Sequence, residues 1–176
     1  MYRRILVPVD ASPVARAGLD AAISLAALTG GELRLVHVLD AAAHASGFET
    51  AAVYCNEVVP RMKQAGAGVL DDCKERCQHG GVKAEGLLLE TLADRICDLV
   101  VAQASEWGAE IIVIGTHGRR GVERLMLGSD AELIVRLSPV PVLLVRAPQE
   151  TALAAALDLP GARRRTAGPP RPQPGS

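Results

Sequence analysis

Aromatic side chains are nearly missing from this sequence of 176 residues: they make up 2% of the chain, against 49% for all hydrophobic residues. The core must therefore be built from aliphatic side chains, as is usual for a parallel sheet covered by helices. Apolar runs of the length that spans a bilayer are also absent. The short apolar stretch after Arg4 ends at Asp10 and lacks a cleavage site, so it does not read as a signal peptide. We expect a cytoplasmic protein with no membrane partner.

An excess of charge of one sign is lacking too, because 19 Lys and Arg stand against 20 Asp and Glu. Such a chain has no electrostatic reason to bind nucleic acid, and we expect none as a partner.

Cysteines are few. Cys73 and Cys77 lie close to His79, but a metal site needs further ligands at suitable spacing, and none is evident. We expect buried thiols on a helix face and no bound metal.

Apolar runs alternate with stretches of helical period, which predicts βαβ units. The predicted strands cover 4–9, 32–39, 82–90, 110–114 and 142–145. Ser12-Pro13 predicts a capped helix that stops at Gly30-Gly31, and a capping box of Thr91 with Asp94 predicts another that stops at Gly108. A long helix ends at Gly80-Gly81, and a last one covers 129–138. Five strands with helical crossovers give the α/β class, as a three-layer, open, five-stranded parallel sheet.

Each predicted helix has one apolar face that should be buried. In the first helix this face holds Val14, Ala17, Ala21, Leu25 and Leu28. In the long helix it holds Val59, Met62, Gly66, Leu70, Cys73 and Cys77, and in the next Leu92, Ile96, Leu99, Val100, Gln103 and Trp107. Residues 1–147 form one predicted domain. Residues 148–176 are rich in Pro, Gly and Arg, and we expect a disordered extension that is either merely solvated or in contact with an anionic partner.

The segment from Gly115 through Gly121 to Gly128-Ser129 is the most informative part of the sequence. It follows a predicted buried strand and opens a helix, where open α/β sheets bind their ligands. Glycines let backbone amides surround phosphate oxygens, and the helix start adds a partial positive charge. A dinucleotide fingerprint after the first strand and a Walker-type P-loop are both absent. The segment predicts a triphosphate-binding loop of another kind.

The spacing Gly115-x2-Gly118-x9-Gly128-Ser129 resembles the signature of the ATP-binding branch of the universal stress protein family. The segments Arg4–Asp10, Leu35–Val38 and Ser138–Val145 are also similar to that family. The resemblance covers roughly residues 1 to 147. It implies an adenine nucleotide alpha hydrolase-like (Rossmann-like) fold with the strand order 3-2-1-4-5.

The same resemblance implies a site for ATP, with AMP or ADP as alternatives and Mg²⁺ carried by the nucleotide. Pro8, Val9 and Asp10 would lie beside the nucleoside, with the Asp10 carboxylate on a ribose hydroxyl and the Val38 backbone on the adenine edge. The ribose and phosphates would be lined by Gly115, His117 and Gly118 and held by Gly128, Ser129 and the amides of Asp130 and Ala131. It also implies a homodimer through the last strand, Val142 to Arg146, whose exposed apolar edge needs a cover.

Several of these residues have a purely structural interpretation as well. Ser129 with Glu132 forms a predicted capping box, Asp10 suits a helix start, and the glycines suit a tight loop. Asp130 and Ala131 depart from the family pattern: Ala131 lacks a hydroxyl for a phosphate, and the negative charge of Asp130 repels one. We therefore expect weak ATP binding.

The expected function is that of a nucleotide-binding regulatory protein of the stress response, because no acid–base pair accompanies the glycine signature. No catalytic residue is assigned. The alternatives are a slow ATPase or self-phosphorylating enzyme, and a dimeric interaction protein that needs no nucleotide. An adenylate-forming enzyme is disfavoured, because no Ser-Gly-Gly-x-Asp-Ser pattern follows the first strand.

Overall fold

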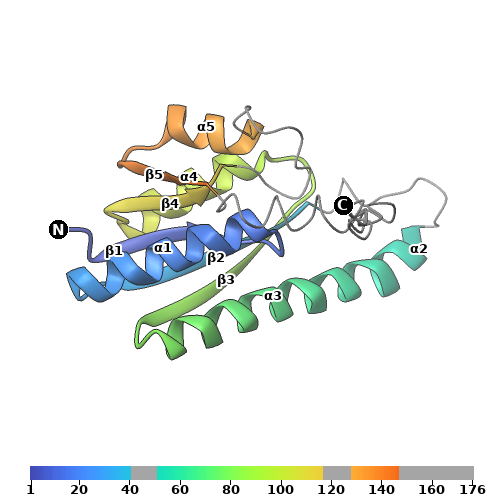
Figure 1. Ribbon diagram of the computed structural model, residues 1–176. Coiled ribbons are helices and arrows are strands. Elements are labelled where there is room, and N and C mark those ends of the chain that lie inside the picture. The colour runs from blue at the N-terminus through green and yellow to red at the C-terminus, as the bar shows by residue number, and fades with distance from the viewer. Residues whose placement is uncertain (41–50, 117–127, 147–176) are drawn as a thin grey trace, which may run out of the picture.

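The computed structural model describes residues 1–40, 51–116 and 128–146, and its centre is a five-stranded parallel sheet (Figure 1). The order of the strands is β3-β2-β1-β4-β5, which confirms the predicted fold class and strand order. The strands are β1 (Arg4–Pro8), β2 (Glu32–Asp40), β3 (Lys83–Thr91), β4 (Ile111–Gly115) and β5 (Val142–Val145). Each lies within one residue of its predicted range.

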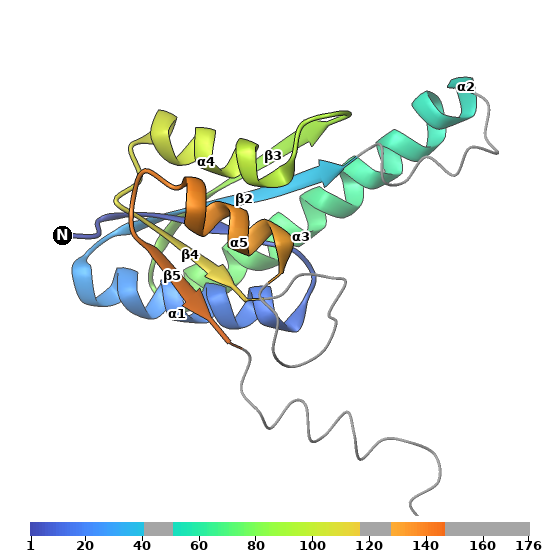
Figure 2. The ribbon, with the colours of Figure 1, turned by 90° about the horizontal axis from the view of Figure 1, so that it is seen from above.

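Helices cover both faces of the sheet, which gives the predicted three layers. α1 (Pro13–Thr29) and α3 (Val59–His79) lie on one face, and α4 (Ile96–Trp107) and α5 (Ser129–Leu137) on the other (Figure 2). The long predicted helix begins as α2 (Ala51–Val53), passes through a π-helical turn (Tyr54–Val58) and continues as α3. Its first turns project beyond the sheet (Figure 1).

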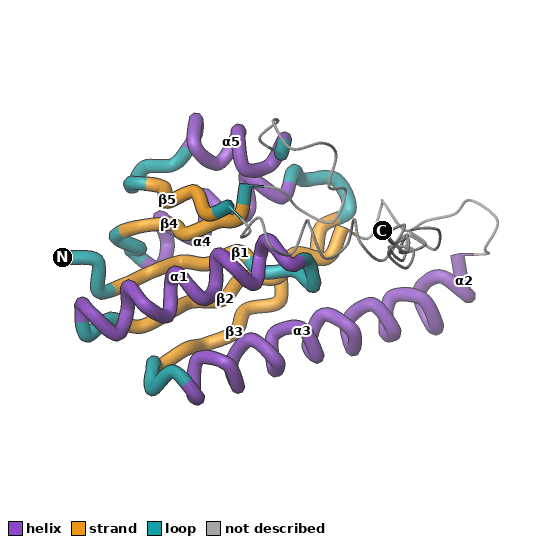
Figure 3. The backbone as a smooth tube through the Cα atoms, viewed as in Figure 1, coloured by secondary structure: helices purple, strands orange, loops and turns teal. Residues whose placement is uncertain are grey.

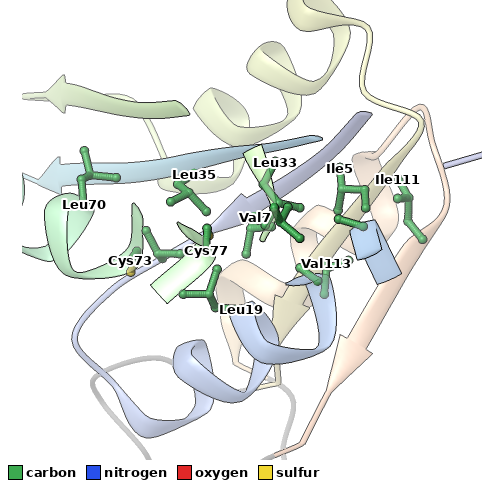
Figure 4. Packing of buried hydrophobic residues seen from close by; sticks show 14 residues of the cluster. Ile5, Val7, Leu19, Leu33, Leu35, Leu70, Cys73, Cys77, Ile111 and Val113 are labelled. Atoms are coloured by element: carbon green, nitrogen blue, oxygen red, sulfur yellow. The ribbon is translucent and has the colours of Figure 1, made fainter. Parts of the chain in front are cut away.

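The core consists of two aliphatic layers, one on each side of β1. Ile5, Leu6 and Val7 have no exposed surface, and alternation along the strand sends Leu6 to the opposite face from its neighbours. The layer beneath α1 and α3 is shown in Figure 4; its labelled members are Ile5, Val7, Leu19, Leu33, Leu35, Leu70, Cys73, Cys77, Ile111 and Val113. β1 is thus a central strand buried on both faces.

The start and end of α1 are as predicted, but its buried face is not. Ser12 caps the helix, because its Oγ accepts a hydrogen bond of 3.1 Å from the Ala15 amide. Leu28 is 86% exposed, and Val14, Ala17, Ala21 and Leu25 are only half-buried. The face against the sheet is made by Ala15, Gly18, Leu19, Ala22 and Ala26. The small side chains of this face let the helix approach the strands closely, whereas the predicted face included the larger Leu25 and Leu28.

The predicted start of α4 is also wrong. The Thr91 hydroxyl accepts hydrogen bonds from the amides of Asp94, at 2.7 Å, and Ala93, at 3.2 Å. These bonds form a local turn, and the helix begins only at Ile96. Leu92, which was expected on the buried face, is 73% exposed. A hydroxyl that satisfies nearby amides does not by itself start a helix.

The predicted buried side of α3 is confirmed for Gly66, Leu70, Cys73 and Cys77, whereas Val59 and Met62 nearer its start are only half-buried. Burial, followed by the neighbouring Cys73, raises the pKa of Cys77 to about 11, so this thiol stays protonated at neutral pH. His79 is exposed, whereas both of these cysteines are buried. Within the ranges that the structure describes, no group of three or more His, Cys, Asp or Glu side chains is placed to hold a metal.

Two predicted regions, the loop at 40–49 and the extension at 148–176, lie almost wholly or wholly outside the described residues. In the part that is described, no helix has the length and apolar character needed to cross a membrane.

Two glycines of α3 provide a matched pair of substitutions. A Cβ on Gly66 would lie 2.9 Å from His37 Cδ2 and from Leu88 Cδ1, whereas one on Gly68 would meet nothing within 4 Å. We predict that Gly66→Ala lowers the free energy of unfolding by about 1–3 kcal/mol through overpacking. Gly68→Ala should raise it by about 0.5–1 kcal/mol through helix propensity. Urea unfolding of both variants checks this, and equal effects would contradict the packing described for α3.

A second prediction concerns the contact between α1 and β4. A Cβ on Gly115 would lie 2.7 Å from both Cγ1 and the carbonyl oxygen of Val14. Gly115→Ala should therefore cost about 1–3 kcal/mol of stability with no ligand present. Gly86→Ala is the control, because the added Cβ would make only ordinary contacts of 3.4 Å or more with Leu70. A melting temperature of Gly115→Ala equal to that of the unmodified chain would refute the steric role of this glycine.

Candidate functional site

The ends of β1 and β4 lie side by side at the carboxyl edge of the sheet, on the right in Figures 1 and 3. Ile5 pairs with Ile111 and Leu6 with Ile112, so continuing the register brings Val9 and Asp10 level with Gly115 and Thr116. The connections from these two strands lead to opposite sides of the sheet, which makes this a topological switch point. The two sequence segments predicted to bind the nucleotide therefore converge.

β2 continues past the point where β1 leaves it. Pairing between them ends at Pro8 with Val36, followed by a hydrogen bond of 2.9 Å from the Val9 amide to the Val36 carbonyl. β2 stays paired with β3 as far as Asp40. Because backbone groups of alternate residues point the same way, the N–H and C=O of Val38 face the side that β1 has left. Val38 thus presents a donor and an acceptor beside the turn at Asp10.

The carboxylate of Asp10 supports the turn into α1. Its Oδ1 accepts a hydrogen bond of 2.8 Å from the Ser12 amide, and Ser12 in turn caps the helix. The helix-start interpretation of Asp10 therefore describes a real contact. Oδ2 takes no part in that bond, and Asp10 is half-buried at the strand end. One carboxylate can hold the turn and still offer an oxygen to a ligand.

Gly115 has a structural reason to be glycine. The first turn of α1 lies against it, with Val14 where a Cβ would stand, and a Cβ on Gly18 would approach its amide nitrogen to 3.2 Å. This contact holds the positive end of α1 next to the end of β4.

Thr116 ties together three segments that meet beyond β4. Its amide donates to the Val145 carbonyl, and its carbonyl accepts from the Gly128 amide, both at 2.9 Å. The second bond brings the residues on either side of 117–127 into contact. The predicted ligand residues His117 and Gly118 lie outside the described residues.

The start of α5 differs from the predicted capping box. Gly128 is the N-cap and Ser129 is the exposed first helical residue, so Ser129 is not the cap that was predicted. The first bond of the helix joins the Glu132 amide to the Gly128 carbonyl at 2.9 Å, so the amides of Ser129, Asp130 and Ala131 precede the helical ladder. The Gly128 amide is engaged by Thr116. The three amides that follow lie at the positive end of the helix.

The side chain of Ala131 belongs to the packing of α5 on α4. Ala131 is 4% exposed and lies in the apolar layer beneath both helices. Burial raises the pKa of the Cys97 thiol, and the charges of Asp98 and, more weakly, Asp130 add to the rise. The negative charge of Asp130 is therefore close enough to the start of α4 to affect Cys97.

Sequence reasoning missed one residue at this edge. His37 is 2% exposed, and its Nδ1 lies 2.7 Å from the Val9 carbonyl oxygen. Since a carbonyl can only accept, Nδ1 carries the proton of this hydrogen bond. The available signal was one titratable residue inside an otherwise apolar strand end, Leu35-Val36-His37-Val38.

A hollow of about 250 Å³ lies at the opposite, amino ends of β2 and β3. Its charges are already neutralised: Arg34 pairs with Glu85 at 2.6 Å, and Lys83 with Glu32 at 3.1 Å. Arg34 also stacks on Trp107, 4.7 Å from the ring centre. With its cations paired, this hollow is a poor site for an anionic ligand, and the carboxyl edge remains the candidate.

The chain is similar to known proteins over most of its length. Residues 1–146 match the sequence model of the Universal stress protein family. "Universal stress protein YxiE" of Bacillus subtilis is 32% identical over 151 residues, covering 83% of this chain and all of that protein.

Two solved structures are also similar. One, from the universal stress protein family of Burkholderia pseudomallei, has 34% identity and a TM-score of 0.65, covering 81% of this chain and 95% of that one. The other, a universal stress protein from Archaeoglobus fulgidus in complex with dAMP, has 25% identity and a TM-score of 0.60, covering 82% and 98%. By its sequence match and its fold, the chain belongs to the universal stress protein family.

Proposed function

We propose that this chain binds an adenine nucleotide, ATP included, at the carboxyl edge of β1, β2 and β4 and acts as a regulatory protein of the stress response. The observation that carries the proposal is the convergence of the Val38 backbone, the Asp10 carboxylate and the amides that open α5. The relative from Archaeoglobus fulgidus that was solved with dAMP supports an adenine nucleotide as the ligand.

The base is read by the Val38 backbone in this proposal. Adenine presents an amino donor next to a ring acceptor, which complements one C=O and one N–H on a strand edge. Guanine presents an oxygen acceptor and a ring N–H in the corresponding places. Its oxygen would face the Val38 carbonyl and its ring N–H would face the Val38 amide, so neither hydrogen bond could form. Pro8 and Val9 flank the base, and Oδ2 of Asp10 accepts a hydrogen bond from a ribose hydroxyl.

The phosphates lie over the Thr116–Gly128 junction, where the positive ends of α1 and α5 add their fields. The amides of Ser129, Asp130 and Ala131 are the donors, and Gly115, His117, Gly118 and Gly128 line the same path. Mg²⁺ arrives bound to the phosphates. The charge of Asp130 keeps the affinity modest, because it lies on the turn that faces the anion.

A regulatory role is favoured over turnover by the state of Asp10. Its carboxylate already supports the Ser12 amide and, in this proposal, the ribose, which leaves it poorly suited to activate water. We place the protein in the cytoplasm, in keeping with its four free cysteines, of which three are buried.

We also propose that β5 mediates a homodimer through Val142 to Arg146. Leu143 and Leu144 are 40% and 37% exposed on this edge strand. The other edge strand, β3, carries Lys83, Glu85 and Glu90, which discourage pairing with a second chain. The apolar edge is therefore the one that needs a cover, and an antiparallel pairing across a two-fold axis continues the sheet.

Calorimetric titration with ATP and Mg²⁺ tests nucleotide binding. We expect saturable binding of ATP and at least about tenfold weaker binding of GTP, because its base edge is mismatched. Asp10→Ala should weaken ATP binding by about tenfold or more, through the lost bond to ribose and the loosened turn. Asp71→Ala, an exposed acid paired with Lys74 on α3, is the control and should bind like the unmodified chain. The absence of heat with ATP at high micromolar protein would refute the proposal.

The dimer is tested by removing one amide. The Pro141 and Val145 carbonyls accept hydrogen bonds from the β4 side, so the alternate residue Leu144 points its amide to the open edge. Leu144→Pro should therefore convert a dimer into a monomer in sedimentation analysis without breaking a bond to β4. Leu144→Ala keeps the amide and should remain largely dimeric. A monomeric unmodified chain at micromolar concentration would contradict the proposal.

A further inference from the structure

His37 occupies the place where the β1–β2 ladder ends. In a continued parallel ladder, the Val9 carbonyl would accept a hydrogen bond from the Val38 amide. The pairing of β1 with β2 stops at Pro8 and Val36, before this bond can form. The Val9 carbonyl instead accepts a hydrogen bond of 2.7 Å from Nδ1 of His37. The imidazole thus stands in for a backbone donor. β1 turns away toward Ser12, and the carbonyl of Val9 is still satisfied although it is no longer paired with β2.

The imidazole is held from the side of α3 as well. His37 lies on the same face of β2 as Leu35 and Leu39, and Gly66 packs directly over it: a Cβ there would come within 2.9 Å of Cδ2 of the ring. The ring is confined between the backbone of α3 and the end of β1. It has little freedom to swing away from the Val9 carbonyl.

We propose that His37 is a positioning residue of the nucleotide site. Its hydrogen bond to Val9 separates β1 from β2 at the right residue, which keeps the Val38 backbone available to a base and directs Asp10 toward the ribose. This inference rests on the proposed function, because it assigns His37 a role in adenine-nucleotide binding. The imidazole need not touch the ligand, so its effect passes through Val9 and Asp10.

Two substitutions separate the hydrogen bond from the packing. His37→Leu has a similar volume and no donor, so the Val9 carbonyl loses its partner. His37→Asn is smaller and leaves a cavity, but its amide group places a donor close to the position of Nδ1. We expect His37→Leu to bind both ATP and AMP about tenfold or more weakly, because the defect lies at the nucleoside. His37→Asn should stay within about threefold of the unmodified chain even though its cavity lowers the melting temperature.

If His37 had a purely structural role, the loss of nucleotide affinity would follow the loss of stability in each variant. It would not depend on whether the variant keeps a hydrogen-bond donor for the Val9 carbonyl. Val100→Ala is the control for stability alone: Val100 is a fully buried residue of α4, on the opposite face of the sheet, and its truncation should lower the melting temperature and leave both affinities unchanged. Hydrogen exchange of residues 9–15 without nucleotide should be faster in His37→Leu than in His37→Asn.

The outcomes for His37 and for the proposed function are distinct. If the unmodified chain binds no ATP, the nucleotide proposal itself is wrong, and the role of His37 in it falls too. If the unmodified chain binds ATP and His37→Leu binds equally well, or if His37→Asn loses as much affinity as His37→Leu, the positioning role alone is overturned.

Discussion

The last hydrogen bond between β1 and β2, from the Val9 amide to the Val36 carbonyl, is the constraint on which the carboxyl edge of this protein depends. Up to that bond the two strands are neighbours in a conventional parallel ladder. Beyond it β2 keeps its pairing with β3 while β1 turns through Asp10 into the cap of α1. A ladder one residue longer would close the strand edge at Val38.

Two close contacts on the same face of the sheet fix this geometry. α1 approaches β4 so closely that Gly115 has no room for a side chain beside Val14. α3 approaches β2 so closely that Gly66 has none above His37. The same close approach of helix and sheet explains why the face of α1 against the sheet is made largely of alanine and glycine. The small residues are therefore part of what aligns the site.

The sequence was sufficient to predict the strands, because each is a short aliphatic run bounded by turn residues, and the two segments that it predicts to bind a nucleotide do lie at one edge of the sheet. It did not predict which face of α1 is buried, since periodicity weighted by hydrophobicity favours Leu28 over Ala26. It did not predict the start of α4 either, because the Thr91 hydroxyl satisfies local amides outside a helix. Two further contacts could not be predicted, because each joins residues that are distant in the chain. They are the hydrogen bond from the Gly128 amide to the Thr116 carbonyl and the one from His37 to the Val9 carbonyl.

Backbone amide chemical shifts, followed by NMR as ATP is added to isotopically labelled protein, test the account most directly. We expect the perturbed amides to cluster at Val9 and Asp10, at Val38 and at Ser129 to Ala131, with those around Trp107 and Lys83 at the opposite edge unchanged. Perturbations confined to the opposite edge, or none at saturating ATP, would contradict the assignment of the carboxyl edge as the nucleotide site.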